Sequence, residues 1–280
     1  MTTAPIPATA YSRPWTFFAL SMVIPWGAWL TAGWISHSAY ATELHWLVLA
    51  LAIGGLCAPF VLTLVMVARY PTLRADLGAR FTNVDRITPW AAVLAVALLP
   101  VFLLLGTGIS LLFGYSPEQF ELRNVFIAAA GGVPVWATLL LAPVVEELAW
   151  HGYGTDALVS RWTVWRTTMV FAIWWMLWHM PLATIAGSYQ AEVVETGWLS
   201  SANFLVSVFP FMILMNWLYY RCGRNIWVPV LFHLSANIGN EVFATHPDTK
   251  AFQTMLLIVL CAWVLWHDRD LFFTKLERLR

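Results

Sequence analysis

Two neighbouring carboxylates, Glu146 and Glu147, stand inside one of the most apolar regions of the chain. Residues 124–145 before them carry no charge, and His151 follows four positions after Glu147. A charged group at the centre of a membrane helix costs about 2.5–3.5 kcal/mol on insertion scales, so such groups are expected to have a function. Adjacent helix residues point about 100° apart, so only one of the two carboxylates can face a given pocket.

Two other apolar segments contain the remaining groups that could do chemistry. One includes His179, and the other includes His233 and Asn237. His233 and Asn237 are four residues apart and therefore share a helix face. Asn240 and Glu241 follow near the end of the same segment, and we interpret them as structural or interfacial rather than catalytic.

These side chains together indicate hydrolysis of an amide bond by an activated water molecule. His151 lies on the helix face of Glu147 and can hold it by a hydrogen bond, which leaves Glu146 free to act on water. A histidine can share that water, and an asparagine or a neutral histidine can donate to an oxyanion. Proton transport is an alternative use of buried Glu and His side chains, but no string of charged residues crosses the full membrane depth.

The composition shows what kind of element must position these groups. Of the 280 residues, 60% are hydrophobic and 11% are charged, whereas a soluble domain has about 25% charged residues. The chain is therefore expected to be an integral membrane protein. Its formal net charge of zero gives no indication of a nucleic-acid partner, so the expected partners are membrane lipid and an apolar peptide. Three widely spaced cysteines indicate neither a disulfide framework nor a metal knuckle.

The apolar runs predict an all-α polytopic membrane protein that forms a single domain over residues 1–280. About 20 apolar residues are needed to cross the hydrocarbon core as a helix. Eight transmembrane helices are predicted, at 15–35, 46–68, 89–113, 126–153, 167–186, 202–220, 226–244 and 251–266. The costly polar groups fall in the fourth, fifth and seventh of these, which predicts a polar pocket between helices 4, 5 and 7.

The distribution of basic residues predicts the orientation of these helices. With the N-terminus and the C-terminus both in the cytoplasm (N-in/C-in), 13 of the 15 Lys and Arg residues fall on the inside, as the positive-inside rule favours. Glu146 and His233 then lie about 12–14 Å from the cytoplasmic ends of their helices. We therefore expect the pocket to open toward the cytoplasm. The segment 70–88 is expected to be a short amphipathic helix on that surface or a basic loop. The predominance of arginine over lysine favours a bacterial plasma (inner) membrane.

Three short motifs resemble those of the CPBP family of intramembrane proteases, which includes the type II CAAX prenyl endopeptidases. The motifs are EELAWHG (146–152), WMLWHMP (175–181) and LFHLSAN (231–237), in the family's order and spacing. The resemblance is close over about residues 125–245, which we take as the motif core, and elsewhere rests on topology.

The resemblance implies roles for individual residues. Glu146 resembles the water-activating base and His179 its partner, and Glu147 resembles a second, orienting carboxylate. His233 and Asn237 resemble the groups that stabilise the oxyanion. Two supporting positions depart from the family pattern, because His151 stands where an arginine is expected and Trp175 where a phenylalanine is expected.

Many members of this family are described as metalloendopeptidases, so a metal ion is an alternative. Glu146, His179 and His233 are the residues that could hold zinc, although their spacing is not that of an HExxH helix. We favour catalysis by glutamate without a metal or other cofactor.

The favoured function is therefore an intramembrane CAAX prenyl protease that acts near the cytoplasmic face on a hydrophobic or lipid-anchored peptide. The alternative is a weak or inactive member of the family that binds peptides, as in bacteriocin immunity, or that acts as a membrane scaffold.

Overall fold

The computed structural model describes residues 10–123, 129–130 and 133–276, and over these residues the chain is almost entirely helical. The helices are α1 (Pro14–Ser36), α2 (His45–Ala68), α3 (Pro71–Thr82), α4 (Pro89–Ser110), α5 (Val135–Ala149), α6 (Thr155–Val159), α7 (Val164–His179), α8 (Tyr189–Thr196), α9 (Trp198–Arg221), α10 (Trp227–Val242), α11 (Lys250–His267) and α12 (Arg269–Phe273). A π-helical turn, Trp150–Gly154, joins α5 to α6. Short 3-10 turns cover Val84–Arg86, Leu111–Phe113, Pro117–Phe120, Met180–Thr184 and Pro247–Thr249. Two two-residue strands, β1 (Ala129–Ala130) and β2 (Val133–Pro134), pair in antiparallel fashion before α5.

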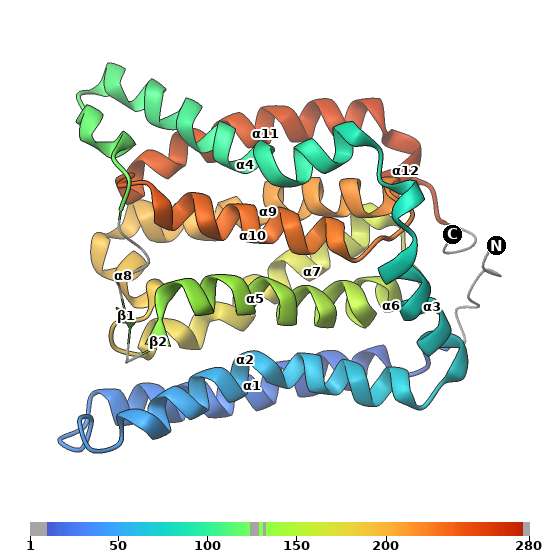
Figure 1. The fold of residues 1–280 in the computed structure, drawn as a ribbon, viewed down its shortest axis with the longest axis horizontal. Coiled ribbons are helices and arrows are strands. Elements are labelled where there is room, and N and C mark those ends of the chain that lie inside the picture. The colour runs from blue at the N-terminus through green and yellow to red at the C-terminus, as the bar shows by residue number, and fades with distance from the viewer. Residues whose placement is uncertain (1–9, 124–128, 131–132, 277–280) are drawn as a thin grey trace.

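The long helices lie side by side in a layered bundle (Figure 1). Helix α1 packs along α2, and α2 packs against α5. Helix α10 contacts α4, α5 and α9, while α11 covers α4 and α9. This arrangement places α5 and α10, which carry two of the three motifs, between other helices of the bundle.

Two glycines allow the outer helices to approach closely. A Cβ on Gly55 would lie 2.4 Å from the Trp29 indole nitrogen, which donates to the carbonyl of Ala52 at 3.0 Å. A Cβ on Gly106 would lie 2.7 Å from the backbone nitrogen of Gln253. Any larger side chain at these positions would push α1 from α2, or α4 from α11.

The outer helices have the length and composition of membrane spans. Among the described residues, five helical segments are long and apolar enough to cross a membrane: Pro14–Ser36, His45–Ala68, Pro89–Phe113, Trp198–Arg221 and Pro247–His267. Their outward faces are apolar, as Val61 and Leu64 on α2 and Val93 and Val96 on α4 illustrate. The chain is therefore an integral membrane protein.

A sixth span is present if the bent pair around the fifth predicted helix counts as one. Residues 164–184 and α8 meet at an angle of 87°. The continuous apolar helix expected over 167–186 therefore stops being α-helical at His179 and then turns sharply.

The remaining two predicted spans are not among these candidates. Helix α5 has 15 residues, but the π-helical turn Trp150–Gly154 and α6 continue it without a break to Val159, whereas α10 has 16 residues and a length of about 24 Å against a hydrocarbon core of about 30 Å. The start of the predicted span 126–153 falls partly on positions 126–128 and 131–132, which lie outside the described residues. The structure therefore shows five or six candidate spans over the described residues, rather than the eight predicted.

Basic residues are concentrated at one end of the bundle, which we call the basic end. It contains the start of α1, the end of α2, α3, α6 and α12, and lies on the right of Figure 1. Eleven described basic residues lie within or beside helix ends at this end of the bundle: Arg13, Arg69, Arg74, Arg80, Arg86, Arg161, Arg166, Arg221, Arg224, Arg269 and Lys275. Only Arg123 and Lys250 lie toward the opposite end, and Arg278 and Arg280 lie outside the described residues.

Candidate active site

Glu147 connects the first and third motifs. It is fully buried, its Oε2 lies 2.5 Å from Nδ1 of His151, and its Oε1 lies 2.7 Å from Nδ1 of His233. The hydrogen bond to His151 was predicted from the spacing of four residues, and the structure confirms it. The bond to His233 joins α5 to α10, so Glu147 fixes two histidines from different helices.

His151 is in turn held by a residue that the sequence analysis missed. Its Nε2 lies 3.0 Å from Oδ1 of Asn216 on α9, and Nδ2 of Asn216 donates to Oγ1 of Thr168 on α7 at 2.9 Å. Asn216 is fully buried. A lone amide in the middle of the apolar run 202–220 was the signal that could have identified it, because buried amides need partners.

Glu146 points in a different direction and accepts hydrogen bonds from two indoles. Nε1 of Trp175 donates to its Oε2 at 3.1 Å, and Nε1 of Trp150 donates to the same oxygen at 3.4 Å. From the sequence, Trp175 was notable only as a tryptophan at a position where the family resemblance implies a phenylalanine. The structure shows that this side chain also supplies a donor to the carboxylate, which a phenylalanine would lack.

Trp175 also brings the two remaining histidines to Glu146. Its ring meets the ring of His179 edge-on at a centroid distance of 4.7 Å and that of His233 at 5.6 Å. One side chain therefore contacts all three of the residues for which the motifs predicted a shared site.

His179 is the last residue of α7, where the helix gives way to a 3-10 turn. Its Nδ1 lies 2.8 Å from the carbonyl oxygen of Trp175. A carbonyl only accepts, so Nδ1 carries the hydrogen and Nε2 is the nitrogen left with a lone pair in the neutral ring. The same reasoning applies to neutral His233, whose Nδ1 donates to the Glu147 carboxylate.

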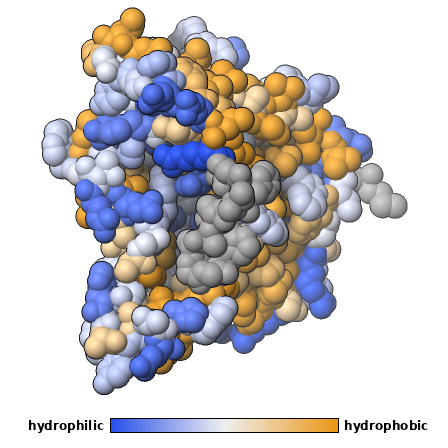
Figure 2. All heavy atoms as spheres, turned by 60° about the vertical axis from the view of Figure 1, so that its left-hand side comes forward, coloured by the Kyte–Doolittle hydropathy of each residue, from blue (hydrophilic) through white to orange (hydrophobic). Residues whose placement is uncertain are grey.

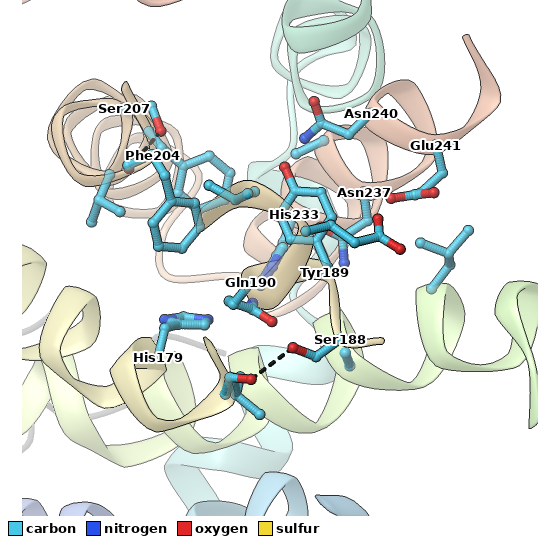
Figure 3. A pocket seen from close by; sticks show the side chains of 18 of the residues that line it. His179, Ser188, Tyr189, Gln190, Phe204, Ser207, His233, Asn237, Asn240 and Glu241 are labelled. Atoms are coloured by element: carbon cyan, nitrogen blue, oxygen red, sulfur yellow. Dashed lines mark hydrogen bonds between the residues drawn. The ribbon is translucent and has the colours of Figure 1, made fainter. Parts of the chain in front are cut away.

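A cavity of about 530 Å³ lies next to these groups, and Glu146, Trp175, His179, His233 and Asn237 all line it. Glu147 and His151 are not among its lining residues. Figure 3 shows His179 projecting from one side of the pocket and His233, Asn237 and Asn240 from another. Apolar side chains complete much of the wall: Leu49, Ile53, Leu56, Leu139, Leu182, Phe204 and Phe211.

The cavity extends toward the end of the bundle opposite the basic end. Beyond Glu146, its lining residues belong to α8, to the end of α10 and to the start of α11, among them Tyr189, Glu192, Glu241 and Lys250. These segments lie on the left of Figure 1, and hydrophilic side chains gather on the face that Figure 2 turns forward. The expectation that the pocket opens toward the cytoplasm therefore requires that this end of the bundle face the cytoplasm, because depth along each helix was counted without knowing what fills the space at the basic end.

A buried ionic network occupies the basic end instead. Arg80 and Arg224 surround Asp156, with Nη1 of Arg80 at 3.0 Å and Nη2 of Arg224 at 2.5 Å from its Oδ2. Asp76 binds both arginines at 2.9 Å. Segment 70–88 does contain the expected helix, α3, but Asp76 and Arg80 turn inward from it. The helix is therefore amphipathic, as expected: one face closes the bundle and the other, which includes Arg74, is exposed.

The possible metal ligands among the described residues are not grouped as a metal site would require. Within the part of the chain that the structure describes, no group of three or more His, Cys, Asp or Glu side chains is placed to hold a metal ion. Glu146, His179 and His233 line one cavity, and Nδ1 of each histidine donates to Trp175 or Glu147, which leaves Nε2 free, but the three side chains are not grouped closely enough to form such a set. As placed, these residues do not fit a metal site, and no chemical step is assigned to a metal.

Comparison with known proteins agrees with the three motifs. Residues 128–239, which contain all three, match a family model described as type II CAAX prenyl endopeptidase Rce1-like. The chain is also 31% identical over 266 residues to CAAX prenyl protease 2 of Methanococcus maripaludis, an alignment that covers 94% of this chain and 97% of the relative. The chain belongs to the type II CAAX prenyl endopeptidase family. It is therefore a membrane-embedded endopeptidase, and the non-catalytic alternative is not favoured.

In this type II CAAX prenyl endopeptidase, the two adjacent glutamates have different surroundings. Glu146 is the carboxylate next to the cavity, whereas Glu147 is enclosed by two histidines. Only one of the two carboxylates therefore faces the cavity, as the separation of about 100° between adjacent helix residues predicted.

Proposed function

We propose that this endopeptidase cleaves a membrane-associated, prenylated peptide by attack of water at the cavity that Glu146, His179 and His233 share. The relative's name as a CAAX prenyl protease supports this substrate class. The observation that carries the catalytic part is the contact of Trp175 with all three side chains. The apolar wall of the cavity suits a hydrophobic or lipid-anchored chain.

In the proposed reaction, Glu146 takes a proton from a water molecule whose oxygen then bonds to the carbonyl carbon of the scissile peptide bond. His179 accepts a hydrogen bond from that water through Nε2 and so orients it. The amide of Asn237 donates to the oxyanion, and His233 donates through Nε2 when that nitrogen is protonated. Glu146 then returns its proton to the leaving nitrogen as the carbon–nitrogen bond breaks. Glu147 does not touch substrate but orients His233.

The experiment that tests this function is cleavage of matched peptides by the purified protein in detergent. A peptide with a prenylated cysteine near its C-terminus is expected to be cut faster than the same peptide without the lipid. Activity is expected to survive dialysis against a chelator, since no metal is assigned a role. Equal cleavage of both peptides would contradict the substrate class, and loss on chelation that zinc restores would contradict the metal-free mechanism.

We also propose that α5 and α10 complete a bundle of eight helices in a bacterial plasma membrane. Both pack between longer helices of the bundle, and each has exposed apolar side chains that suit a lipid environment, such as Leu140 on α5 and Leu231 on α10. The sequence led us to expect that both the basic residues and the opening of the pocket face the cytoplasm. These two expectations conflict in this structure, because the basic end and the cavity lie at opposite ends of the bundle. The concentration of arginines favours the basic end as the cytoplasmic one.

This orientation predicts which positions a membrane-impermeant maleimide can label in intact cells. In a background with Cys57, Cys222 and Cys261 replaced by alanine, Glu192→Cys on α8 is expected to react without lysis. Arg74→Cys on α3 is exposed at the basic end and is expected to react only after lysis. The reverse pattern would place the cavity on the cytoplasmic side and show that the arginines do not set the orientation.

A further inference from the structure

The backbone of the turn that carries His151 is held by a buried arginine from another helix. His151 belongs to the π-helical turn Trp150–Gly154, in which the regular α-helical hydrogen-bond register is interrupted. Nη1 of Arg80 donates to the carbonyl of His151 at 2.6 Å, and Nη2 donates to that of Gly152 at 2.8 Å. Buried carbonyls need partners, and this guanidinium supplies them to two consecutive residues of the turn.

The guanidinium itself is fixed from several sides. Asp156 and Asp76 accept from it or pair with it at 3.0 and 2.9 Å, and the hydroxyl of Tyr219 lies 2.8 Å from Nη1. Arg80 is 3% exposed. A planar group with that many partners has one orientation, so it defines where the backbone of His151 lies.

The ring of His151 is fixed independently through Asn216. The hydroxyl of Thr168 donates to the carbonyl of Val164 at 2.8 Å, so it accepts from the Asn216 amide nitrogen at 2.9 Å. That fixes the amide oxygen as the atom facing Nε2 of His151 at 3.0 Å, and Nε2 must carry a hydrogen. Nδ1 is thereby directed to the Glu147 carboxylate, 2.5 Å away.

We infer that Arg80 and Asn216 are positioning residues for peptide cleavage, Arg80 through the backbone of His151 and Asn216 through its ring. Together they let His151 hold Glu147, and Glu147 hold His233, in a single arrangement. This inference rests on the proposed function, because it assigns consequences for kcat to residues that touch neither the cavity nor the substrate. The same contacts explain how His151 can hold Glu147 at a position where the family resemblance implies an arginine.

The test compares Asn216→Leu with Asn216→Asp in the cleavage assay. Leucine removes the acceptor for His151 and is expected to lower kcat by about 10- to 100-fold without changing KM, since small misplacements have effects of that size. Aspartate keeps an oxygen facing His151 and is expected to restore most of kcat. Arg80→Lys, which cannot bond both carbonyls in the same fork, is expected to resemble the leucine variant.

Asn225→Ala is the matched control. Asn225 is another fully buried asparagine, but its amide donates to the carbonyl of Asn83, away from His151. The Asn225→Ala substitution is expected to lower thermal stability in detergent while leaving kcat unchanged. The positioning role of Arg80 and Asn216 would be overturned if the loss of kcat were proportional to the loss of thermal stability in all four variants, including Asn225→Ala.

A spectroscopic readout separates this inference from the proposed function. In protein with ¹⁵N-labelled histidine, the signal that disappears in His151→Gln is expected to report a protonated Nε2 in the wild type and to shift in Asn216→Leu. An unchanged signal in Asn216→Leu would overturn the inference even if cleavage is normal. Failure of the proposed function would instead appear as wild-type protein that cuts no prenylated peptide, with the His151 signal as expected.

Discussion

Replacement of Glu146 by glutamine is expected to lower kcat for peptide cleavage by about 10²- to 10⁴-fold, the range that general bases contribute. The change keeps the size of the side chain and keeps an oxygen that can accept from the Trp175 and Trp150 indoles. It removes the ability to take a proton from water. The protein should therefore remain folded while losing the chemical step.

The measurement is single-turnover cleavage of the prenylated peptide, with binding followed separately by competition. Trp175→Phe is the useful comparison, because it removes only the indole donor to Glu146 and leaves an aromatic ring beside both histidines. It should cost far less than Glu146→Gln. Wild-type turnover by the glutamine variant would exclude Glu146 as the base.

Replacement of His179 by glutamine is expected to produce the second large effect, a fall in kcat of about 10²-fold or more. The hydrogen bond from Nδ1 to the Trp175 carbonyl leaves Nε2 as an acceptor at the cavity, and glutamine does not reproduce that ring geometry. If His179 and Glu146 act on the same water, their effects are not independent. The double variant Glu146→Gln, His179→Gln should then be no slower than Glu146→Gln alone.

His267→Gln provides the control for this prediction. His267 is exposed at the end of α11 and stacks on Trp263, far from the cavity lining. Its variant should cleave at the wild-type rate. Strictly additive losses for Glu146 and His179 would show that the two residues act in separate steps, contrary to the proposed shared water.

Local spacing predicted several features of the site correctly. Four residues separate Glu147 from His151, which places them on one helix face, and the structure contains their hydrogen bond. His233 and Asn237 have the same spacing, and both line the cavity. These predictions succeeded because they depend only on the period of one helix.

Features that depend on two or more helices were missed. The contact of Trp175 with Glu146, the support of His151 by Asn216 and the reach of Arg80 to the π-helical turn each join residues 29 to 71 positions apart. Nothing in a single helix period indicates such pairs. Arg80 in particular looked like part of a basic surface segment, because the same helix carries the exposed Arg74 and Arg86 follows it.

Residence in a membrane, the placement of the intramembrane ionisable groups on three segments and the different neighbours of Glu146 and Glu147 could all be predicted from the amino-acid sequence. These follow from composition, from the cost of charge in lipid and from helix geometry, all of which are local properties. The end of the bundle toward which the cavity extends and the side chains that hold His151 could be learned only from the packed helices. The physical reason is that packing between distant helices, here the buried ionic network of Asp76, Arg80, Asp156 and Arg224, fills one end and leaves the other hollow.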